Sequence, residues 1–361
     1  MPTIKDIATL AGVSHTTVSH VIHKTRPVST KIRGDVEAAI KRLTYFPGPG
    51  TRSSHRPSAG IIGLLVSNSR NPFFAELAAG IEETCYRAGY CVVLCNSDDQ
   101  PERQHTYLRA LLEKQIDGLI VCSTGDDVGL ANDLRAAKVP VIIVDRQVKG
   151  LNSDLVQVNH YKGGYLATRH LLELKHKAIG CIAGPKTISV SIDRLNGYRK
   201  ALAEASAPFR SEWVVQGDFT AEGGYKAARI LLKRARITAV FAGNDLMGIS
   251  LLRFAEEHGI RVPQQLSVIG FDGIDLGRYI YPALTTVGQS IRCQGETAAA
   301  TLLERIRRGP EGKSRKIIIN PELTVRESTA EPAQFVLSRY YFLQKSNRGA
   351  VTLNSSSHEQ S

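Results

Sequence analysis

Residues 3–45 have the sequence TIKDIATLAGVSHTTVSHVIHKTRPVSTKIRGDVEAAIKRLTY, and they settle the class of the first domain. Ile4 and Ile7 recur with the spacing of one helical face, and Gly12 then permits a tight turn. Ser14 can cap a second helix, which carries an apolar face of its own. The segment therefore predicts a helix-turn-helix unit.

A third helix is expected after Ser29, because Ile32, Val36 and Ile40 again recur with helical spacing. Three helices of this size can close around a small core. The outward side of the second helix carries short polar side chains of the kind that reach base edges in the DNA major groove. These side chains are His15, Thr16, Thr17, Ser19 and His20.

The charge of this segment is also informative. Residues 1–60 hold nine Lys or Arg and three Asp or Glu, so nine minus three leaves +6 of the +12 formal charge of the chain. A purely structural helical unit is the alternative, since helix pairs are common. A basic unit with a polar presenting helix instead favours binding to nucleic-acid phosphates.

The composition of the whole chain is that of a folded protein. Its 361 residues are 42% hydrophobic and 22% charged, which is enough for two or three compact units. No apolar run approaches the roughly 20 residues that cross a bilayer, and no basic start with an apolar segment behind it indicates export. We therefore expect a cytoplasmic protein with no membrane contact.

The cysteine and histidine positions predict no metal site. The six cysteines lie mostly in apolar runs, without zinc spacing, so we expect buried thiols in a reducing compartment. A redox pair of Cys91 and Cys95 is the alternative. His160, His170 and His176 match no helical metal motif and are expected to be structural. Because no catalytic triad or carboxylate pair stands out either, we expect no enzyme activity and no cofactor.

Short apolar runs alternate with helical patterns after residue 60, which is typical of parallel sheets covered on both faces. Some 270 residues of this kind exceed one doubly wound domain, so we predict an α/β core of two parallel-sheet subdomains with a cleft between them. The predicted parts are a helix-turn-helix domain (1–46), a Pro-, Gly- and Ser-rich hinge (47–60), an N-subdomain (61–160 and 291–320), a C-subdomain (161–290 and 321–328) and a poorly ordered extension (329–361).

The residues that follow the apolar runs are candidate ligand contacts, because ligands bind at the carboxyl ends of parallel strands. Asp145 and Arg146 follow VIIV, and Asp272 ends SVIGFD. Carboxylates, amides and arginines suit neighbouring hydroxyls, and phenylalanines pack on the C–H face of a sugar ring. No GxGxxG follows the first run and no GxxxxGK[ST] occurs, so a sugar fits better than a nucleotide.

Simpler roles are the alternatives for several of these residues. Asp145 and Arg146 could form an ordinary strand-end ion pair, which is weak at a surface. Phe73 and Phe74 could be core side chains, although the Asn-Pro pair before them favours a loop. Asp245 is expected to cap the helix that begins LMGISLL, which leaves ligand contact to the residue before it.

The order of the motifs is similar to that of one known family. After IKDIATLAGVSHTTVSHVI come SNSRNPFF, DGLIV, VPVIIVDR, FAGNDLMGISLL, VIGFDGIDL and PALTTVGQ. Together they resemble the LacI/GalR family of bacterial transcription regulators over residues 2–328, and within it the ribose and purine repressors. The resemblance implies a core like that of periplasmic binding proteins, a small effector, a homodimer and a near-palindromic operator DNA.

The same resemblance implies an effector site. The sugar contacts of periplasmic ribose-binding proteins correspond to Asn71, Phe73, Phe74, Asp145, Arg146, Arg194, Phe219, Asn244, Asp272 and Gln289. A purine pocket of this family would instead have an aromatic residue in place of Arg146. Ribose, or a closely related sugar, is therefore the expected effector, with a purine corepressor as the alternative.

On the DNA side, the resemblance implies that His15, Thr16 and His20 contact bases. The full set expected at DNA is Thr3, Ser14, His15, Thr16, Thr17, Ser19, His20, Arg26 and Arg52. The hinge departs from the family pattern, because PGPGTRSS stands where PNALARSL is usual and Ser54 replaces the leucine that wedges into the minor groove. We therefore expect weaker or less bent operator complexes.

These expectations combine into a sugar-responsive repressor, in which closure of the cleft changes the spacing of two DNA-binding domains. Induction is the expected response to a sugar, whereas a purine would act as corepressor. An exported sugar-binding protein would share the core but would not need residues 1–60. An enzyme of sugar metabolism would need a catalytic base or a phosphate loop in the cleft.

Overall fold

The computed structural model describes residues 4–23, 26–43, 59–123, 128–309 and 312–333. The expectations for Thr3, Arg52 and the hinge at Ser54 lie outside these ranges, as does the end of the chain from residue 334. No helix among the described residues is both long enough and apolar enough to span a bilayer.

The first domain consists of the three expected helices, α1 (Ile4–Ala11), α2 (His15–His23) and α3 (Thr30–Arg42). Ser14 accepts a hydrogen bond from the amide of Thr17 at 3.1 Å, and Ser29 accepts one from Ile32 at 3.4 Å, so each caps the helix that follows. Ile7, Val18 and Val36 are fully buried where the helices meet.

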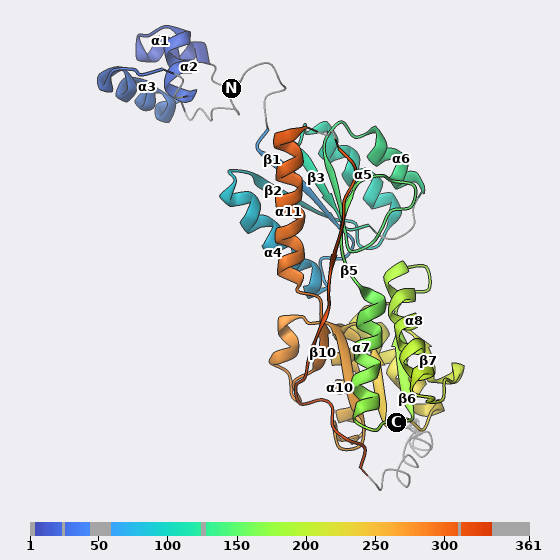
Figure 1. The fold of residues 1–361 in the computed structure, drawn as a ribbon. Helices are drawn as coiled ribbons and strands as arrows, with labels where there is room; N and C mark the ends of the chain where they lie inside the picture. The colour runs from blue at the N-terminus through green and yellow to red at the C-terminus, as the bar shows by residue number, and fades with distance from the viewer. Residues whose placement is uncertain (1–3, 24–25, 44–58, 124–127, 310–311, 334–361) are drawn as a thin grey trace, which may run out of the picture.

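Two parallel sheets with helical layers form the rest of the molecule, as Figure 1 shows. The sheet of the N lobe has the order β11-β5-β4-β3-β1-β2, and all its pairings are parallel. Its strands are β1 (Ile61–Val66), β2 (Cys91–Asn96), β3 (Gly118–Val121), β4 (Val141–Val144), β5 (Asp154–Val158) and β11 (Lys316–Ile319). Its helices are α4 (Pro72–Arg87), α5 (Pro101–Glu113), α6 (Val128–Ala136) and α11 (Ile291–Arg308).

The C lobe repeats this plan with the strand order β12-β10-β9-β8-β6-β7, in which only the edge strand β12 is antiparallel to its neighbour. Its strands are β6 (Ile179–Ala183), β7 (Val214–Gln216), β8 (Ala239–Ala242), β9 (Ser267–Asp272), β10 (Thr285–Gly288) and β12 (Glu322–Thr324). Its helices are α7 (His160–Glu173), α8 (Ser189–Glu204), α9 (Ala221–Arg234) and α10 (Asp245–Glu257), with short 3₁₀ turns at Ser211–Trp213 and Asp275–Arg278.

The chain passes between the lobes in three places, from β5 to α7, from β10 to α11 and from β11 to β12 (Figure 1). The helices α7 and α8 approach closely, because a Cβ added to Gly164 would lie 2.1 Å from the carbonyl oxygen of Arg194. Only glycine therefore allows these two backbones to meet. This packing brings the start of α7 beside the middle of α8, at the entrance to the C lobe.

Three expectations need correction. The strand β2 lies at an edge of its sheet, so Val93 and Leu94 are 40% and 45% exposed instead of covered on both faces. Cys91 and Cys293 are exposed, whereas Cys85, Cys122 and Cys181 are buried as expected and Cys95 is intermediate. Four strands lie in segments for which no strand was predicted, β5, β7, β11 and β12, each short or strongly polar.

Residues 329–331, which were expected to belong to a poorly ordered extension, are bonded to the C lobe. Thr329 bonds to His170 at 3.0 Å, and the carbonyl of Ala330 bonds to the buried His176 at 2.9 Å. Lys175 forms an ion pair with Glu331. These contacts attach residues 329–331 to the C lobe, because the buried histidines need partners for their ring nitrogens.

Candidate functional site

A cleft with about 280 Å³ of empty space, part of it open to solvent, lies between the lobes, and all ten of the expected effector contacts line it. The N lobe contributes Asn71, Phe73, Phe74, Asp145 and Arg146, and the C lobe and its connections contribute Val190, Arg194, Phe219, Asn244, Asp272 and Gln289. Val190 was not expected from the sequence. The fold thus brings the set together, and their contact with a ligand remains a prediction.

The first edge of the cavity is the start of α4. Asn71 caps this helix, because its side-chain oxygen accepts a hydrogen bond from the amide of Phe73 at 3.0 Å. Phe73 and Phe74 therefore lie in the first helical turn and not in the expected loop. Their rings meet edge to face with centroids 5.0 Å apart, and they are 3% and 4% exposed. The two rings belong to the apolar core and also form a wall of the cavity.

The end of β4 supplies the charged side chains of the N lobe. Asp145 has a φ of +65°, which turns the chain sharply after the strand. The guanidinium of Arg146 donates to the carbonyl of Ser123 at 3.0 Å, and its Nε lies 3.8 Å from Asp145 Oδ2. Asp145 and Arg146 are 5% and 6% exposed, so they do not form the ordinary surface ion pair.

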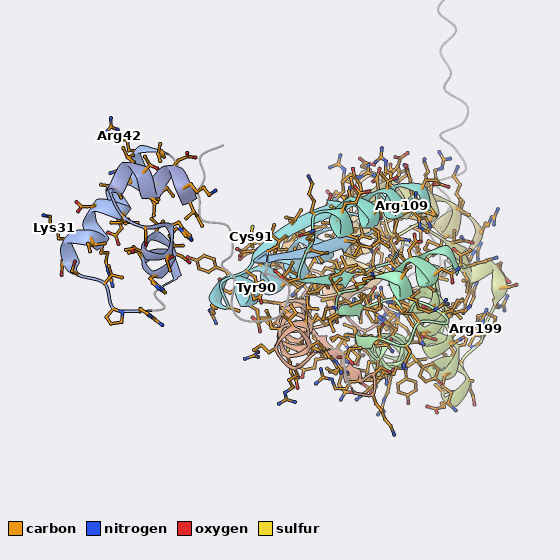
Figure 2. All side chains as sticks on the ribbon, turned by 90° about the horizontal axis from the view of Figure 1, so that it is seen from above. Lys31, Arg42, Tyr90, Cys91, Arg109 and Arg199 are labelled. Atoms are coloured by element: carbon orange, nitrogen blue, oxygen red, sulfur yellow. The ribbon has the colours of Figure 1, made fainter. Side chains whose placement is uncertain are left out.

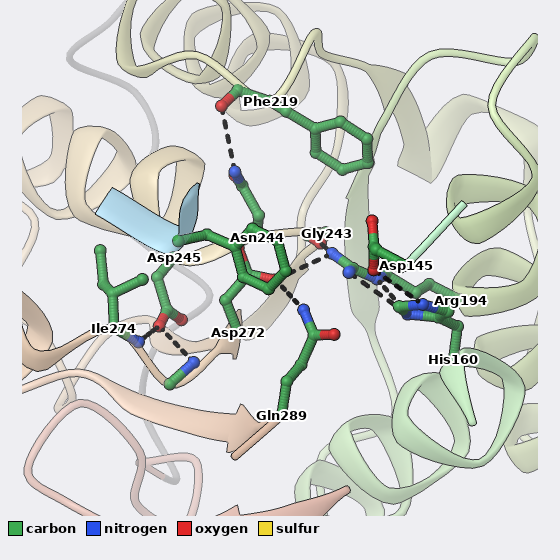
Figure 3. Close-up of polar contacts among 12 residues, drawn as sticks. Asp145, His160, Arg194, Phe219, Gly243, Asn244, Asp245, Asp272, Ile274 and Gln289 are labelled. Atoms are coloured by element: carbon green, nitrogen blue, oxygen red, sulfur yellow. Dashed lines mark hydrogen bonds and ion pairs between the residues drawn. The ribbon is translucent and has the colours of Figure 1, made fainter. Parts of the chain in front are cut away.

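Arg194 is the central cation of the C lobe, as Figure 3 shows. Its Nη1 donates to the carbonyl of Gly243 at 2.6 Å and lies 3.3 Å from Asp272 Oδ1. The guanidinium also lies over the ring of Phe271, 3.7 Å from the centroid, and 5.6 Å from that of Phe219. These contacts hold the cation in one position against the cavity.

The cap of α10 is Asn244 and not the expected Asp245. The Asn244 side-chain oxygen accepts from the amide of Met247 at 3.0 Å, while its Nδ2 donates to the carbonyl of Phe219 at 3.0 Å. Asp245 is fully buried behind the cavity and accepts hydrogen bonds from the amide of Ile274 and from Thr286. The neighbouring residue therefore caps the helix, because its side chain is the one that points back to the first turn.

Two buried carboxyl groups of the C lobe have raised pKa values. Burial and the nearby Asp272 raise the pKa of Asp245 to about 8, against the hydrogen bonds that it accepts. Burial also raises the pKa of Asp272 to about 7, although Arg194 and the side chain of Gln289, which donates to it at 2.6 Å, oppose this rise. Two carboxylates this close cannot both be ionised without cost.

Three buried polar atoms at the N-lobe side of the site have no hydrogen-bond partner within the protein, Asp145 Oδ1, Arg146 Nε and His160 Nε2. Asp145 Oδ1 and His160 Nε2 lie 3.2 Å apart, but they are not aligned as a hydrogen bond. Buried polar atoms in native proteins are nearly always satisfied, so a cluster of unsatisfied ones beside a cavity favours the binding of a polar ligand there.

His160 is a residue beside the cleft whose position the sequence did not indicate. It was expected to be structural because its spacing to the other histidines matched no metal site, yet it lies between Asp145 and Arg194. A weak signal was present, since in the segment DLVQVNH His160 comes two residues after Val158, the end of a short run of partly apolar residues. That run, strand β5, was not predicted as a strand, so the residues after it were not among the expected strand-end contacts.

The expected DNA contacts on α2 are all at least partly accessible. His15 and Thr16 are exposed, and Thr17, Ser19 and His20 are partly exposed. The hydroxyl of Ser14 serves as a helix cap, and Arg26 is exposed after the helix. Figure 2 shows that charged side chains such as Lys31 and Arg42 project outward from this domain. Among the described residues, no group of three or more His, Cys, Asp and Glu could hold a metal ion.

A helix-turn-helix domain followed by two lobes around a polar cavity defines the class of effector-binding DNA regulators. Residues 3–48 match the family of bacterial regulatory proteins of the lacI type, and residues 59–329 match the periplasmic binding proteins and sugar-binding domain of the LacI family. The chain belongs to the LacI family.

Curated relatives in this family are transcriptional repressors. The chain is 42% identical to the repressor PurR of Photobacterium profundum over 92% of its length and 99% of the relative, and 44% identical to PurR of Yersinia pestis over 92% and 98%. The chain is thus a DNA-binding transcriptional repressor of the LacI family, in the ribose and purine branch.

Solved structures give the same fold with different ligands. The lac repressor dimer bound to operator and the anti-inducer ONPF is 28% identical over 91% of this chain and 99% of that one, with a TM-score of 0.78. A LacI-family regulator of Enterococcus faecium with bound ribose is 34% identical over 76% and 100%, with a TM-score of 0.69. The relatives therefore leave open whether the effector is a purine or a sugar.

Proposed function

We propose that this repressor binds a near-palindromic operator as a homodimer and that a pentose, with ribose as the first candidate, occupies the cleft and controls operator affinity. One helix-turn-helix reads one half-site, so a two-fold dimer matches a palindromic operator. The observation that carries the choice of effector is the cavity itself, whose polar lining is charged on both lobes and incompletely satisfied.

The polar lining suits a ligand with several adjacent hydroxyl groups. Asp145 and Asp272 accept hydrogen bonds, Arg146 and Arg194 donate them, and Gln289 can do both. A pentose presents neighbouring hydroxyls that each donate one bond and accept another, so it can satisfy carboxylates and guanidinium groups together. The Phe rings of the cavity offer apolar surface to the C–H face of a sugar ring. The E. faecium relative with bound ribose supports the same choice.

A purine base is the second candidate, and the names of the full-length relatives favour it. Both repressors at 42% and 44% identity are called PurR. Phe74 and Phe219 offer aromatic faces to a planar base, which is the usual way in which proteins hold one. Hypoxanthine has fewer hydrogen-bond donors than a pentose, so it would leave more of the two carboxylates unsatisfied.

The ligand controls DNA through the relative position of the lobes. The backbone amide of Asp275 in the C lobe donates a hydrogen bond to Glu76 Oε1 of α4 at 2.9 Å, so the two lobes are in contact. A ligand that binds both lobes favours the arrangement in which its contacts are complete, and this changes the spacing of the two DNA-binding domains. The expected coupling is about 1–3 kcal/mol. A sugar is expected to weaken operator binding and a purine to strengthen it.

Calorimetry on the full-length chain tests the effector. Ribose, arabinose, xylose, hypoxanthine and guanine are titrated separately, and melting is recorded with each at high concentration. A ligand at a hundred times its Kd adds about 2.7 kcal/mol to stability, which shifts the melt clearly. Binding of ribose without binding of either base supports the proposal. If hypoxanthine or guanine binds and ribose does not, the effector is a purine and the sugar proposal is wrong.

Fluorescence anisotropy tests the effect on DNA. A duplex selected from a random pool by the purified protein serves as operator, so no target gene has to be known. Ribose is expected to lower the operator affinity about 5- to 150-fold, which corresponds to the coupling free energy above. A shuffled duplex is the control for non-specific binding, and an unchanged operator affinity with saturating ribose would contradict the proposal.

A further inference from the structure

His160 lies where the two lobes meet, and no role follows for it from the effector contacts described above. It is the first residue of α7 and follows β5 after a single intervening residue, so it stands at one of the three connections between the lobes. Its side chain is 3% exposed. Figure 3 shows its ring beside Arg194 and Asp145.

Arg194 fixes the tautomer of this imidazole. Nε and Nη2 of Arg194 both lie 3.3 Å from His160 Nδ1. A guanidinium has donors only, so Nδ1 must accept, and the ring proton is then on Nε2. Nε2 lies 3.2 Å from Asp145 Oδ1, within ion-pair distance although the two atoms are not aligned as a hydrogen bond. Burial, the largest influence, and the charge of Arg194 lower the pKa of His160, although Asp145 raises it. The lowered pKa favours the neutral ring.

The result is a chain of three side chains across the cleft. Arg194 belongs to α8 of the C lobe, and Asp145 follows β4 of the N lobe. Burial raises the pKa of Asp145, but His160 and the two arginines lower it more, so this side chain is a carboxylate. A neutral imidazole with one acceptor and one donor is suited to stand between a cation and an anion.

The packing around His160 leaves the ring little freedom. Its ring stacks on Phe271 with centroids 5.8 Å apart and planes 29° apart, and Phe271 also supports the guanidinium of Arg194. The close approach of α7 to α8 at Gly164 holds His160 of α7 near Arg194 of α8. A side chain without ring nitrogens at position 160 would therefore leave Asp145 and Arg194 misaligned, because the packing gives it no other position from which to contact them.

We infer that His160 is a positioning residue, which aligns Asp145 of one lobe and Arg194 of the other for a shared ligand and thereby couples occupancy of the cleft to the arrangement of the lobes. Its own side chain stands behind these two residues and does not line the cavity. The inference uses the proposed function only in requiring that a small polar ligand binds both lobes.

Nitrogen NMR on the full-length, ligand-free protein with labelled histidine tests the tautomer. His160 is identified by comparison with the His160→Asn variant. The expected spectrum at pH 7 has a protonated Nε2 and an unprotonated Nδ1. A signal with the proton on Nδ1, or on both nitrogens, would overturn the inference whatever the effector proves to be.

A double-mutant cycle tests the positioning role. Ribose affinity is measured for the wild type, His160→Ala, Asp145→Asn and the double variant, with melting curves for all four. His160→Ala is expected to weaken ribose binding about tenfold or more, as for a lost hydrogen bond to a charged group, and to cost much less when Asp145 is already changed. Additive losses would mean that His160 does not act through Asp145, and the inference fails.

Two further variants separate positioning from mere stability. His170→Asn is the matched control, because His170 lies on the same helix and bonds to Thr329 away from the cleft. His160→Asn retains an acceptor for Arg194 but cannot reach Asp145. Its melting temperature should therefore be close to that of the wild type, whereas the effect of ribose on operator affinity should stay reduced. If the wild type binds neither sugar nor base, the proposed function fails, and the NMR result still decides the geometry of His160.

Discussion

The DNA-binding domain and the effector cleft place their functional side chains in opposite environments. His15 and Thr16 are exposed on one short helix. Asp145, Arg194 and Asp272 are 5%, 5% and 4% exposed and come from separate elements of two lobes. The surface expected to contact DNA is thus encoded in nine consecutive residues, whereas the cleft proposed for a small polar ligand requires long-range assembly.

The two regions also differ in the size of their cores. In the described part of the DNA-binding domain, the buried apolar residues are Ile7, Ala8, Val18, Val21, Val36 and Ala39. The lobes contain four larger clusters. A small core has little stability to lose, so the same substitution should have unequal consequences in the two regions.

The largest expected effect uses this inequality. Ile7→Ala removes a fully buried side chain and should cost about 2–5 kcal/mol, which is enough to unfold the small domain. Operator binding should disappear while ligand binding and melting of the lobes stay unchanged. Ile62→Ala removes the same group from the N lobe, where it should lower the melting temperature without loss of operator binding. Anisotropy and calorimetry are the measurements, and equal effects on DNA would refute the comparison.

A second substitution acts on the cleft alone. Arg194→Met keeps much of the volume of the side chain but removes its hydrogen bonds, so ligand affinity should fall about 100-fold or more. Operator binding without ligand should remain within about twofold, because α2 is untouched. Arg199→Met on the same helix is the control, since Arg199 is exposed and lies outside the cavity. The distinction between the regions would not hold if Arg199→Met impaired ligand binding equally.

A third substitution acts on the DNA-binding surface alone. His15→Ala should lower operator affinity about 5- to 150-fold, the range for one base contact, and relax sequence preference at one position of each half-site. The salt dependence of binding should hardly change, because no phosphate contact is lost. Thr9→Ala on α1, whose hydroxyl bonds to the carbonyl of Lys5, is the control. A uniform loss on every DNA sequence would assign His15 to the phosphates instead.

The smallest expected effect concerns pH. The pKa of Asp245 is raised to about 8, so the folded state binds more protons than the unfolded state, and this contribution to stability is lost as pH rises towards 8. The buried histidines act in the opposite direction at lower pH, since their pKa values are lowered. Asp245→Asn should therefore show a smaller drop in melting temperature between pH 6 and pH 8.5 than the wild type. Parallel curves for the two proteins would contradict this role.

Much of the molecule follows from local patterns. Helical spacing and the caps Ser14 and Ser29 predict the first domain, and the apolar runs predict the central strands of both sheets. The edge strands β7 and β12 have only three residues each, and in β11 the apolar run is limited to residues 317–319 after a basic stretch, so none gives a clear strand signal. Strand β5 begins with the ionised Asp154, which Arg305 and Arg315 neutralise from distant elements, so its sequence alone does not look like a buried strand.

The residues of the candidate site were likewise predictable from the sequence only in part. Strand-end positions, together with the family resemblance, indicate the ten cavity residues, because the ends of parallel strands meet at one edge of a sheet. Asn244 caps α10 in place of Asp245 because the buried Asp245 carboxyl bonds to the amides of Gly273 and Ile274 in the loop after β9, which no local rule contains. His160 escaped prediction for the same reason, since both of its partners are distant in the sequence.

The sequence by itself determined the class of protein, the helix that is expected to contact DNA and the chemical character of the cleft, because periodicity, caps and residue type are local properties. Tertiary structure alone decided which charges face each other, which polar atoms are left unsatisfied and where His160 stands between Asp145 and Arg194. Those features depend on distances between segments that are far apart in the chain, and such distances arise only when both sheets and their helices have packed.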